Sequence, residues 1–261
     1  MGIVNVTPDS FSDGGRFLAP ERAIAHAREL VDQGADLLDI GGESTRPGAR
    51  GVSADEELAR VAPVLAGAAD VGVPISIDTS KAPVAEAALD AGAEIVNDIT
   101  ALRFDPSMAG VCADRRCFVV LMHMQGTPRT MQANPMYGDV VDDVKAFLAA
   151  RIEFATGEGV AEGRIWVDPG IGFGKTVRHN LELLHRLGEL RELGRPIVVG
   201  TSRKGFIGAI TGRDVGDRVG GTIASNVMAM RAGAEILRVH DVVEVRQAIL
   251  ISEAVLAAAS G

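Results

Sequence analysis

The chain has 261 residues, of which 47% are hydrophobic, and it carries 26 Lys and Arg against 35 Asp and Glu, a net charge of −9. This length and apolar content can build a sizeable core, which excludes a disordered protein. The acidic balance argues against a nucleic-acid binder, and no apolar stretch approaches the roughly 18 residues that a membrane span needs.

No signal peptide with a charged start and an apolar middle opens the chain, so we expect a soluble, cytoplasmic protein. The two cysteines, Cys112 and Cys117, are five positions apart. This spacing fits neither a zinc site nor a Cys-x-x-Cys redox pair, and we expect two reduced thiols.

Short runs rich in Val and Ile recur along the chain and predict eight strands. They cover residues 2–6, 37–40, 75–77, 95–98, 118–122, 165–167, 197–199 and 236–239. The runs lack a long alternation of polar and apolar residues, which is typical of strands that are buried on both faces.

Helical patterns lie between these strands. Residues 20–33 carry an apolar stripe that stops at Gly34, and Ser53-Ala-Asp-Glu56 is a capping box that opens the next helix. Residues 83–91 end at Gly92, and another helical stretch runs from position 142 to near Gly157. Eight strand–helix units predict a single (β/α)₈ barrel (a TIM barrel) over residues 1–261, with its active site at the C-terminal ends of the strands.

The competing architecture is an open, doubly wound sheet, which favours a Gly-rich fingerprint after the first strand. The sequence has Asn5-Val-Thr-Pro-Asp-Ser10 there instead. Residues 170–176 resemble a phosphate-binding loop, but position 169 is Pro where that motif requires Gly. We therefore favour the barrel.

Polar residues lie at the C-terminal end of every predicted strand or just beyond it. They are Asn5, Asp39 with Glu43, Asp78, Asn97 with Asp98, His123, Asp168, Ser202-Arg203-Lys204, and Arg238 with His240. Asp39 and Asp98 are expected to bond neighbouring backbone, while His123 and Lys175 stay open between a structural or surface role and a role in the site. The loops 7–20, 41–53, 123–137 and 168–178 exceed the usual length of such connections, which indicates binding loops.

The residue types suggest a ligand. Asp78, Asn97 and Asp168 suit the hydrogen-bonding edge of a planar heterocycle. Arg46, Lys204, Arg238 and His240 suit a phosphorylated group. Asn5 can ligate a hard cation such as Mg²⁺ if phosphate oxygens and water complete the shell. The residues by themselves predict a barrel enzyme that acts on a phosphorylated heterocycle.

Several stretches together resemble one family, the dihydropteroate synthases of folate biosynthesis. They are 1–15 (MGIVNVTPDSFSDGG), 41–48 (GGESTRPG), 76–79 (SIDT), 96–98 (VND), 121–129 (LMHMQGTPR), 168–175 (DPGIGFGK), 202–204 (SRK) and 238–241 (RVHD). The resemblance implies a transferase that joins (7,8-dihydropterin-6-yl)methyl diphosphate to 4-aminobenzoate, giving 7,8-dihydropteroate and pyrophosphate. It also implies dependence on Mg²⁺, membership of an enzyme class that sulfonamides target, and a homodimer.

The resemblance also implies roles for particular residues. The pterin would contact Asp78, Asn97, Asp168, Lys204 and Arg238, and the pyrophosphate would contact Asn5, Thr45, Arg238 and His240. Asn5 would hold the Mg²⁺. The aminobenzoate pocket and its loops would comprise Thr45, Arg46, Pro47, Phe173, Ser202, Phe11 and Asp9, and the chemistry would rest on Lys204, Arg238, His240 and Asp168.

Two other functions remain open. A corrinoid-linked methyltransferase domain binds methyltetrahydrofolate in a similar barrel and would share Asp78, Asn97 and Asp168, but it would not explain the loop with Thr45 and Arg46. A non-catalytic pterin-binding protein would not need Asn5, Arg238 and His240 together, because storage of a pterin requires no contacts to pyrophosphate.

Overall fold

The computed structural model describes residues 1–7, 19–45 and 48–258, over which strands and helices alternate. The strands are β1 (Gly2–Asn5), β2 (Leu38–Gly41), β3 (Ile75–Asp78), β4 (Ile95–Asp98), β5 (Phe118–Met122), β6 (Ile165–Asp168), β7 (Val198–Val199) and β8 (Ile236–Leu237). All eight predicted strands are confirmed to within two residues at each end.

Helices follow the strands along the chain. They are α1 (Ala19–Asp32), α2 (Ala54–Ala68), α3 (Ala82–Asp90), α4 (Met108–Arg115), α5 (Val140–Gly157), α6 (Val177–His185), α7 (Gly205–Thr211), α8 (Val219–Arg231) and α9 (Val242–Ala258), with short 3₁₀ turns at Glu162–Arg164, Leu187–Leu193 and Val215–Asp217. Among the described residues, none of the helices has both the length and the apolar character of a membrane span.

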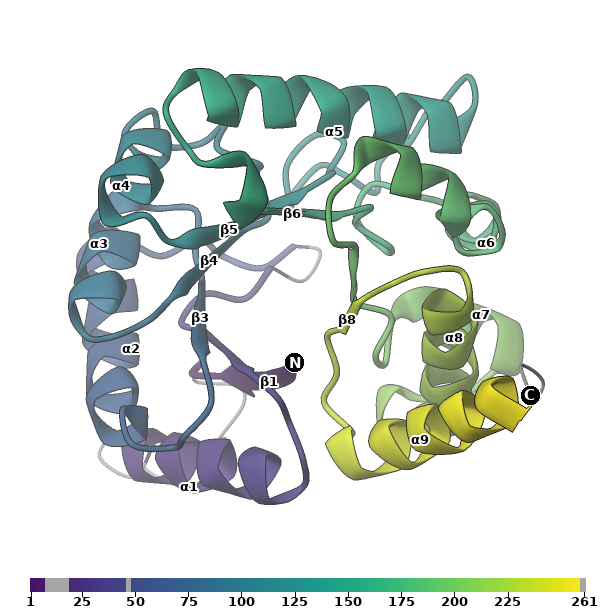
Figure 1. Cartoon of the computed structure of the whole chain (residues 1–261), viewed down its shortest axis with the longest axis horizontal. Helices are drawn as coiled ribbons and strands as arrows, with labels where there is room; N and C mark the ends of the chain where they lie inside the picture. The colour runs from purple at the N-terminus through teal and green to yellow at the C-terminus, as the bar shows by residue number, and fades with distance from the viewer. Residues whose placement is uncertain (8–18, 46–47, 259–261) are drawn as a thin grey trace.

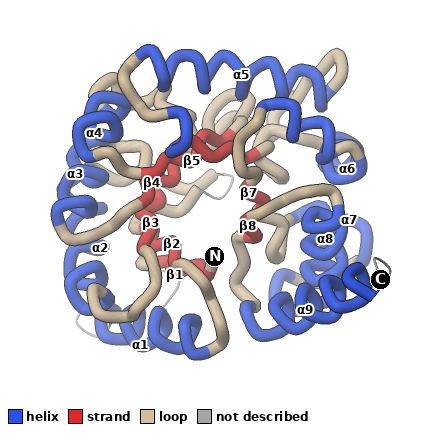
Figure 2. The backbone as a smooth tube through the Cα atoms, in the orientation of Figure 1, coloured by secondary structure: helices blue, strands red, loops and turns tan. Residues whose placement is uncertain are grey.

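The strands form the predicted barrel, with helices around the outside (Figure 1, Figure 2). β1 to β6 pair in chain order as one parallel sheet, and β7 pairs with β8. Single bridges, Gly2 with Val239 and Val167 with Ile197, join the two sheets. The ladder is therefore continuous from β1 to β6 and thin on either side of β7 and β8.

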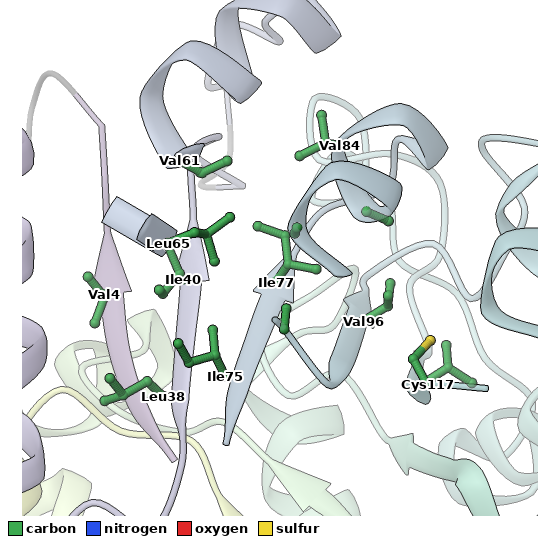
Figure 3. Close-up of a cluster of buried hydrophobic side chains, with 14 of the residues drawn as sticks. Val4, Leu38, Ile40, Val61, Leu65, Ile75, Ile77, Val84, Val96 and Cys117 are labelled. Atoms are coloured by element: carbon green, nitrogen blue, oxygen red, sulfur yellow. The ribbon is translucent and has the colours of Figure 1, made fainter. Parts of the chain in front are cut away.

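One side of the strands packs against the helices and forms the main core. Ile40 and Ile77 are fully buried there, and Figure 3 shows them near Val61 and Leu65 of α2 and Val84 of α3. Side chains that alternate along a strand point to opposite faces. The outward phase of each strand is thus occupied by the branched apolar residues that marked the strands in the sequence.

The other side of the strands faces the interior of the barrel. Ile95, Val120 and Val198 cluster there with Trp166, whose ring centroid lies 5.1 Å from that of Phe118. Two positions further along their strands come Asn97, Met122, Gly200 and Asp168. The apolar layer thus fills the barrel interior towards the N-terminal ends of the strands. The inward-facing positions become mainly polar at the C-terminal ends.

The capping box predicted at Ser53 is half formed. Ser53 Oγ accepts a hydrogen bond from the backbone N–H of Glu56 at 3.2 Å, so Ser53 is the N-cap of α2. The Glu56 carboxylate instead pairs with Arg60, one turn further along the helix, at 2.5 Å.

A buried ion cluster joins α2, the start of α3 and the loop after β2. Lys81 Nζ lies 2.5 Å from a carboxylate oxygen of Glu57 and 2.5 Å from one of Glu43. The Glu57 side chain is fully buried, and Glu43 also accepts the backbone N–H of Val52 at 3.2 Å. Glu43 thereby ties together the two ends of the loop that carries Thr45.

We expect Lys81→Met to lower the free energy of unfolding by about 3 kcal/mol, because it leaves the Glu57 carboxylate buried without its cation. Urea unfolding of the full chain measures this. Lys145→Met is the matched control, since Lys145 pairs with the exposed Glu192 and should cost less than about 1 kcal/mol. Equal losses in the two variants would contradict the structural role of Lys81.

Candidate active site

Inward-facing polar side chains meet at the C-terminal ends of the strands because the strand register aligns them. Asn5 is level with Gly41, Gly41 with Asp78, and Asp78 with Asn97. Asn97 is level with Val120 of β5, and Met122, two positions further along β5, is level with Asp168 of β6. A pocket opens at this end of the barrel, lined by Thr45, Asp78, Asn97, Ile99, Met122, Asp168, Gly170, Ile171, Phe173, Gly200, Lys204 and Arg238.

Arg238 stands at the centre of the hydrogen bonds in this pocket. Its Nε donates to Asp39 Oδ2 at 2.6 Å, and its Nη2 donates to Asp78 Oδ2 at 2.7 Å. Asn97 Nδ2 also donates to Asp39 Oδ2, at 3.1 Å. Burial by itself would lower the pKa of Arg238, but Asp39 and Asp78 outweigh it and hold the pKa above its ordinary value.

Asp39 is the residue of this network that the sequence did not assign to the site. The expectation that it bonds neighbouring backbone is wrong, since its partners are the side chains of Arg238 and Asn97. Asp39 lies two positions before the end of β2 and therefore shares the inward phase with Gly41. The spacing of two residues between Asp39 and the end of the strand could have indicated that Asp39 faces the barrel interior. For Asp98 the expectation is confirmed, as it accepts the backbone N–H groups of Thr100 and Leu102.

Burial shifts the ionisation of the carboxyl groups in the pocket. It raises the pKa of Asp78 to about 7, with Arg238 opposing the shift and Asp39 adding to it. Burial also raises the pKa of Asp168, which the backbone N–H of Gly170, donating at 2.7 Å, partly offsets. A ligand that donates N–H groups to these carboxylates would favour their charged form.

Lys204 lies on the far side of the pocket, beside Phe173. Its Nζ is 4.0 Å from the centroid of the Phe173 ring, a cation–π contact. Burial lowers the pKa of Lys204 to about 8, and the charge of Asp168 limits the shift. The predicted pterin contacts Asp78, Asn97, Asp168, Lys204 and Arg238 thus line one pocket, together with Thr45 and Phe173.

His240 is positioned by Ser202. The backbone N–H of His240 donates to Ser202 Oγ at 3.1 Å, and Ser202 Oγ lies 3.0 Å from His240 Nδ1. The neighbouring residues Arg203 and Asp241 form an ion pair that holds the two loops together. Burial, with Arg238 adding to it, lowers the pKa of His240 to about 3, so the imidazole is neutral at pH 7 and offers hydrogen bonds, without a positive charge.

Asn5 ends β1 at the same level as Gly41 and is half-buried. Within the described residues, no cluster of three or more His, Cys, Asp or Glu side chains could hold a metal ion. A single amide oxygen at the end of β1 suits an Mg²⁺ ion that substrate phosphates and water would mainly hold. The predicted loop residues Asp9, Phe11, Arg46 and Pro47 lie outside the described residues.

Comparisons with known proteins agree with this geometry. A family model described as pterin binding enzyme matches residues 1–240. The dihydropteroate synthase of Synechocystis sp. is 47% identical over 97% of this chain and 89% of the relative, and that of Escherichia coli K12 is 45% identical over 99% and 92%. The structure of Xanthomonas albilineans dihydropteroate synthase with 4-aminobenzoic acid is similar with a TM-score of 0.93 and 49% identity, covering 98% of this chain and 92% of that one. The chain belongs to the dihydropteroate synthase family of pterin-binding enzymes.

Proposed function

We propose that this chain joins (7,8-dihydropterin-6-yl)methyl diphosphate to 4-aminobenzoate, producing 7,8-dihydropteroate and pyrophosphate in folate biosynthesis. The observation that carries the proposal is the buried group of Asp39, Asp78 and Asn97 around Arg238, with Asp168 and Lys204 lining the same pocket. Structures of relatives with 4-aminobenzoic acid and with 7,8-dihydropteroate support it.

The pterin edge carries N–H donors, which match the acceptor oxygens of Asp78, Asp168 and Asn97. Lys204 can donate to a ring nitrogen or to the carbonyl oxygen. The guanidinium of Arg238 is planar and already fixed by two carboxylates, so it can lie against the ring while keeping both ion pairs.

In the reaction, the amine nitrogen of 4-aminobenzoate attacks the methylene carbon, and the bond from that carbon to the diphosphate oxygen breaks. Pyrophosphate leaves with the electron pair, and the amine nitrogen loses one proton to solvent. Arg238 stabilises the charge that grows on the leaving oxygens, and the neutral His240 donates a hydrogen bond to them. This route needs no nucleophilic Ser or Cys.

We propose that Asn5 and the diphosphate oxygens would hold an Mg²⁺ ion, and we assign Thr45, which lines the pocket, to the pyrophosphate. When bound, Mg²⁺ supplies Lewis-acid stabilisation of the leaving group. Phe173 and Ser202 are assigned to the aminobenzoate end. Asp9, Phe11, Arg46 and Pro47 are assigned to loops that cover it.

We propose a homodimer formed through α7, α8 and α9, which lie together in Figure 1. Large apolar side chains are exposed on these helices: Ile210, Met228, Leu250, Ile251 and Val255. Exposed large apolar side chains on neighbouring helices favour association. Sedimentation of the full chain as a monomer at assay concentration would exclude this assembly.

The free thiols of Cys112 and Cys117 support a cytoplasmic location.

We expect Arg238→Ala to lower turnover by about 100-fold, the effect of removing one preorganised group that stabilises charge. Arg238→Lys should recover little, because an ammonium cannot bridge Asp39 and Asp78 in one plane. Pyrophosphate release under saturating substrates measures both variants. A loss smaller than threefold in Arg238→Ala would remove Arg238 from the catalytic groups.

We expect pterin affinity to weaken as the pH falls below about 7, because Asp78 then holds a proton and can no longer accept pterin N–H groups with both oxygens. The dissociation constant of the pterin should rise by nearly tenfold per pH unit, the dependence expected when binding is linked to the loss of one proton. Calorimetric titration with the 6-hydroxymethyl pterin, which lacks a leaving group, measures this. Asp78→Asn should bind more weakly and lose this pH dependence. If the pH dependence persists in Asp78→Asn, another group titrates.

A further inference from the structure

The loop between β6 and α6 packs against the loop after β5 at distances that only glycine allows. Gly170, Gly172 and Gly174 have positive φ angles of 67°, 84° and 61°. A Cβ atom at Gly170 would lie 1.9 Å from the carbonyl oxygen of His123, and one at Gly174 would lie 2.8 Å from that of Gln125. The loop therefore has one narrowly defined shape.

The ammonium group of Lys175 holds this loop through its backbone carbonyl groups. Its Nζ donates to the carbonyl oxygens of Gly170 and Phe173, both at 3.0 Å, and to His123 Nδ1 at 2.9 Å. Lys175 is only 3% exposed. It is thus a buried cation that joins the end of β5 to the loop after β6, and its reading as a surface charge is wrong.

The stability of the fold does not account for this lysine. Within the described part of the chain, no carboxylate oxygen lies within ion-pair distance of Nζ. Burial lowers the pKa of Lys175 to about 7, and the more distant Asp168 opposes the shift only in part. A buried ammonium without a direct carboxylate partner costs free energy of folding, which its hydrogen bonds to the carbonyl oxygens of Gly170 and Phe173 offset only in part.

The shape of the loop matters at the pocket. Phe173 lines the pocket together with Asp78 and Asp168, and its ring is the one that contacts Lys204. Gly172 also backs the Lys204 side chain, since a Cβ there would lie 3.0 Å from Lys204 Cδ. Lys204 itself is held by its place at the start of α7. Holding the carbonyl groups on both sides of Gly172 therefore sets where the Phe173 ring lies against it.

We propose that Lys175 is a positioning residue for the aminobenzoate end of the site. It sets loop 170–175 so that Phe173 is in place for the arylamine substrate. The proposal rests on the proposed function, because it assigns Phe173 to the second substrate. Lys175 itself contacts neither substrate.

The first test is the kinetics of Lys175→Met, which keeps the length and volume of the side chain and removes the charge. The KM for 4-aminobenzoate should rise about tenfold, the scale of losing hydrogen bonds to a charged group. The KM for the pterin diphosphate should change by less than threefold. Lys145→Met, which removes an ammonium on the outer surface, should change neither. Equal rises of both KM values in Lys175→Met would indicate general loosening and overturn the proposal.

The second test repeats Lys175→Met in a Phe173→Ala background. If Lys175 acts through Phe173, its substitution there should raise the KM for 4-aminobenzoate by less than twofold. A full tenfold rise in both backgrounds would show that Lys175 acts by another route.

The third test does not depend on activity. Trp166 is the single tryptophan of the chain, so Trp166→Phe with Phe173→Trp places one fluorescent reporter in the loop. Adding Lys175→Met should at least double its acrylamide quenching, while adding Lys145→Met should not. Unchanged quenching would overturn the proposal. If the unmodified chain forms no dihydropteroate, the proposed function fails, and quenching still decides whether Lys175 holds the loop.

Discussion

The contact of Arg238 with Asp39 and Asp78 is the interaction on which the site depends. Arg238 ends the last strand and its two partners lie on the second and third, so the contact spans the barrel interior. None of the three could stay charged there alone, because burial strongly disfavours an isolated charge. Together they fix a planar cation beside Asp78, whose pKa burial raises to about 7.

The barrel makes this contact possible through register and phase. Parallel pairing brings the C-terminal ends of the strands to one end of the barrel. Because side chains alternate between the two faces of a strand, the inward-facing positions are mostly apolar towards the N-terminal ends and polar at the C-terminal ends. The two loops beside the pocket are then held by buried lysines. Lys81 holds Glu43 at the base of one loop, and Lys175 holds the carbonyl groups of the other. Buried cations thus line the pocket and also hold the loops that border it.

Much of this was predictable from the sequence, and the parts that were not share a physical cause. Strand positions follow from local apolar runs, and Asp78, Asn97 and Asp168 follow from their places at strand ends. The role of Asp39 depends on Arg238, 199 positions away, and that of Lys175 on His123, 52 positions away. Local patterns do not encode such pairings. The neutral state of His240 depends mainly on its burial, which only the folded chain determines.

The most direct test of the account is pyrophosphate release from the pterin diphosphate, with and without 4-aminobenzoate and Mg²⁺. The account predicts release that requires both, with one dihydropteroate formed for each pyrophosphate. Tight pterin binding without release would contradict it and favour a pterin-binding protein, in which the fixed guanidinium of Arg238 serves only to hold the ring. Release at an equal rate without 4-aminobenzoate would also contradict it, since the arylamine would then not be the attacking group.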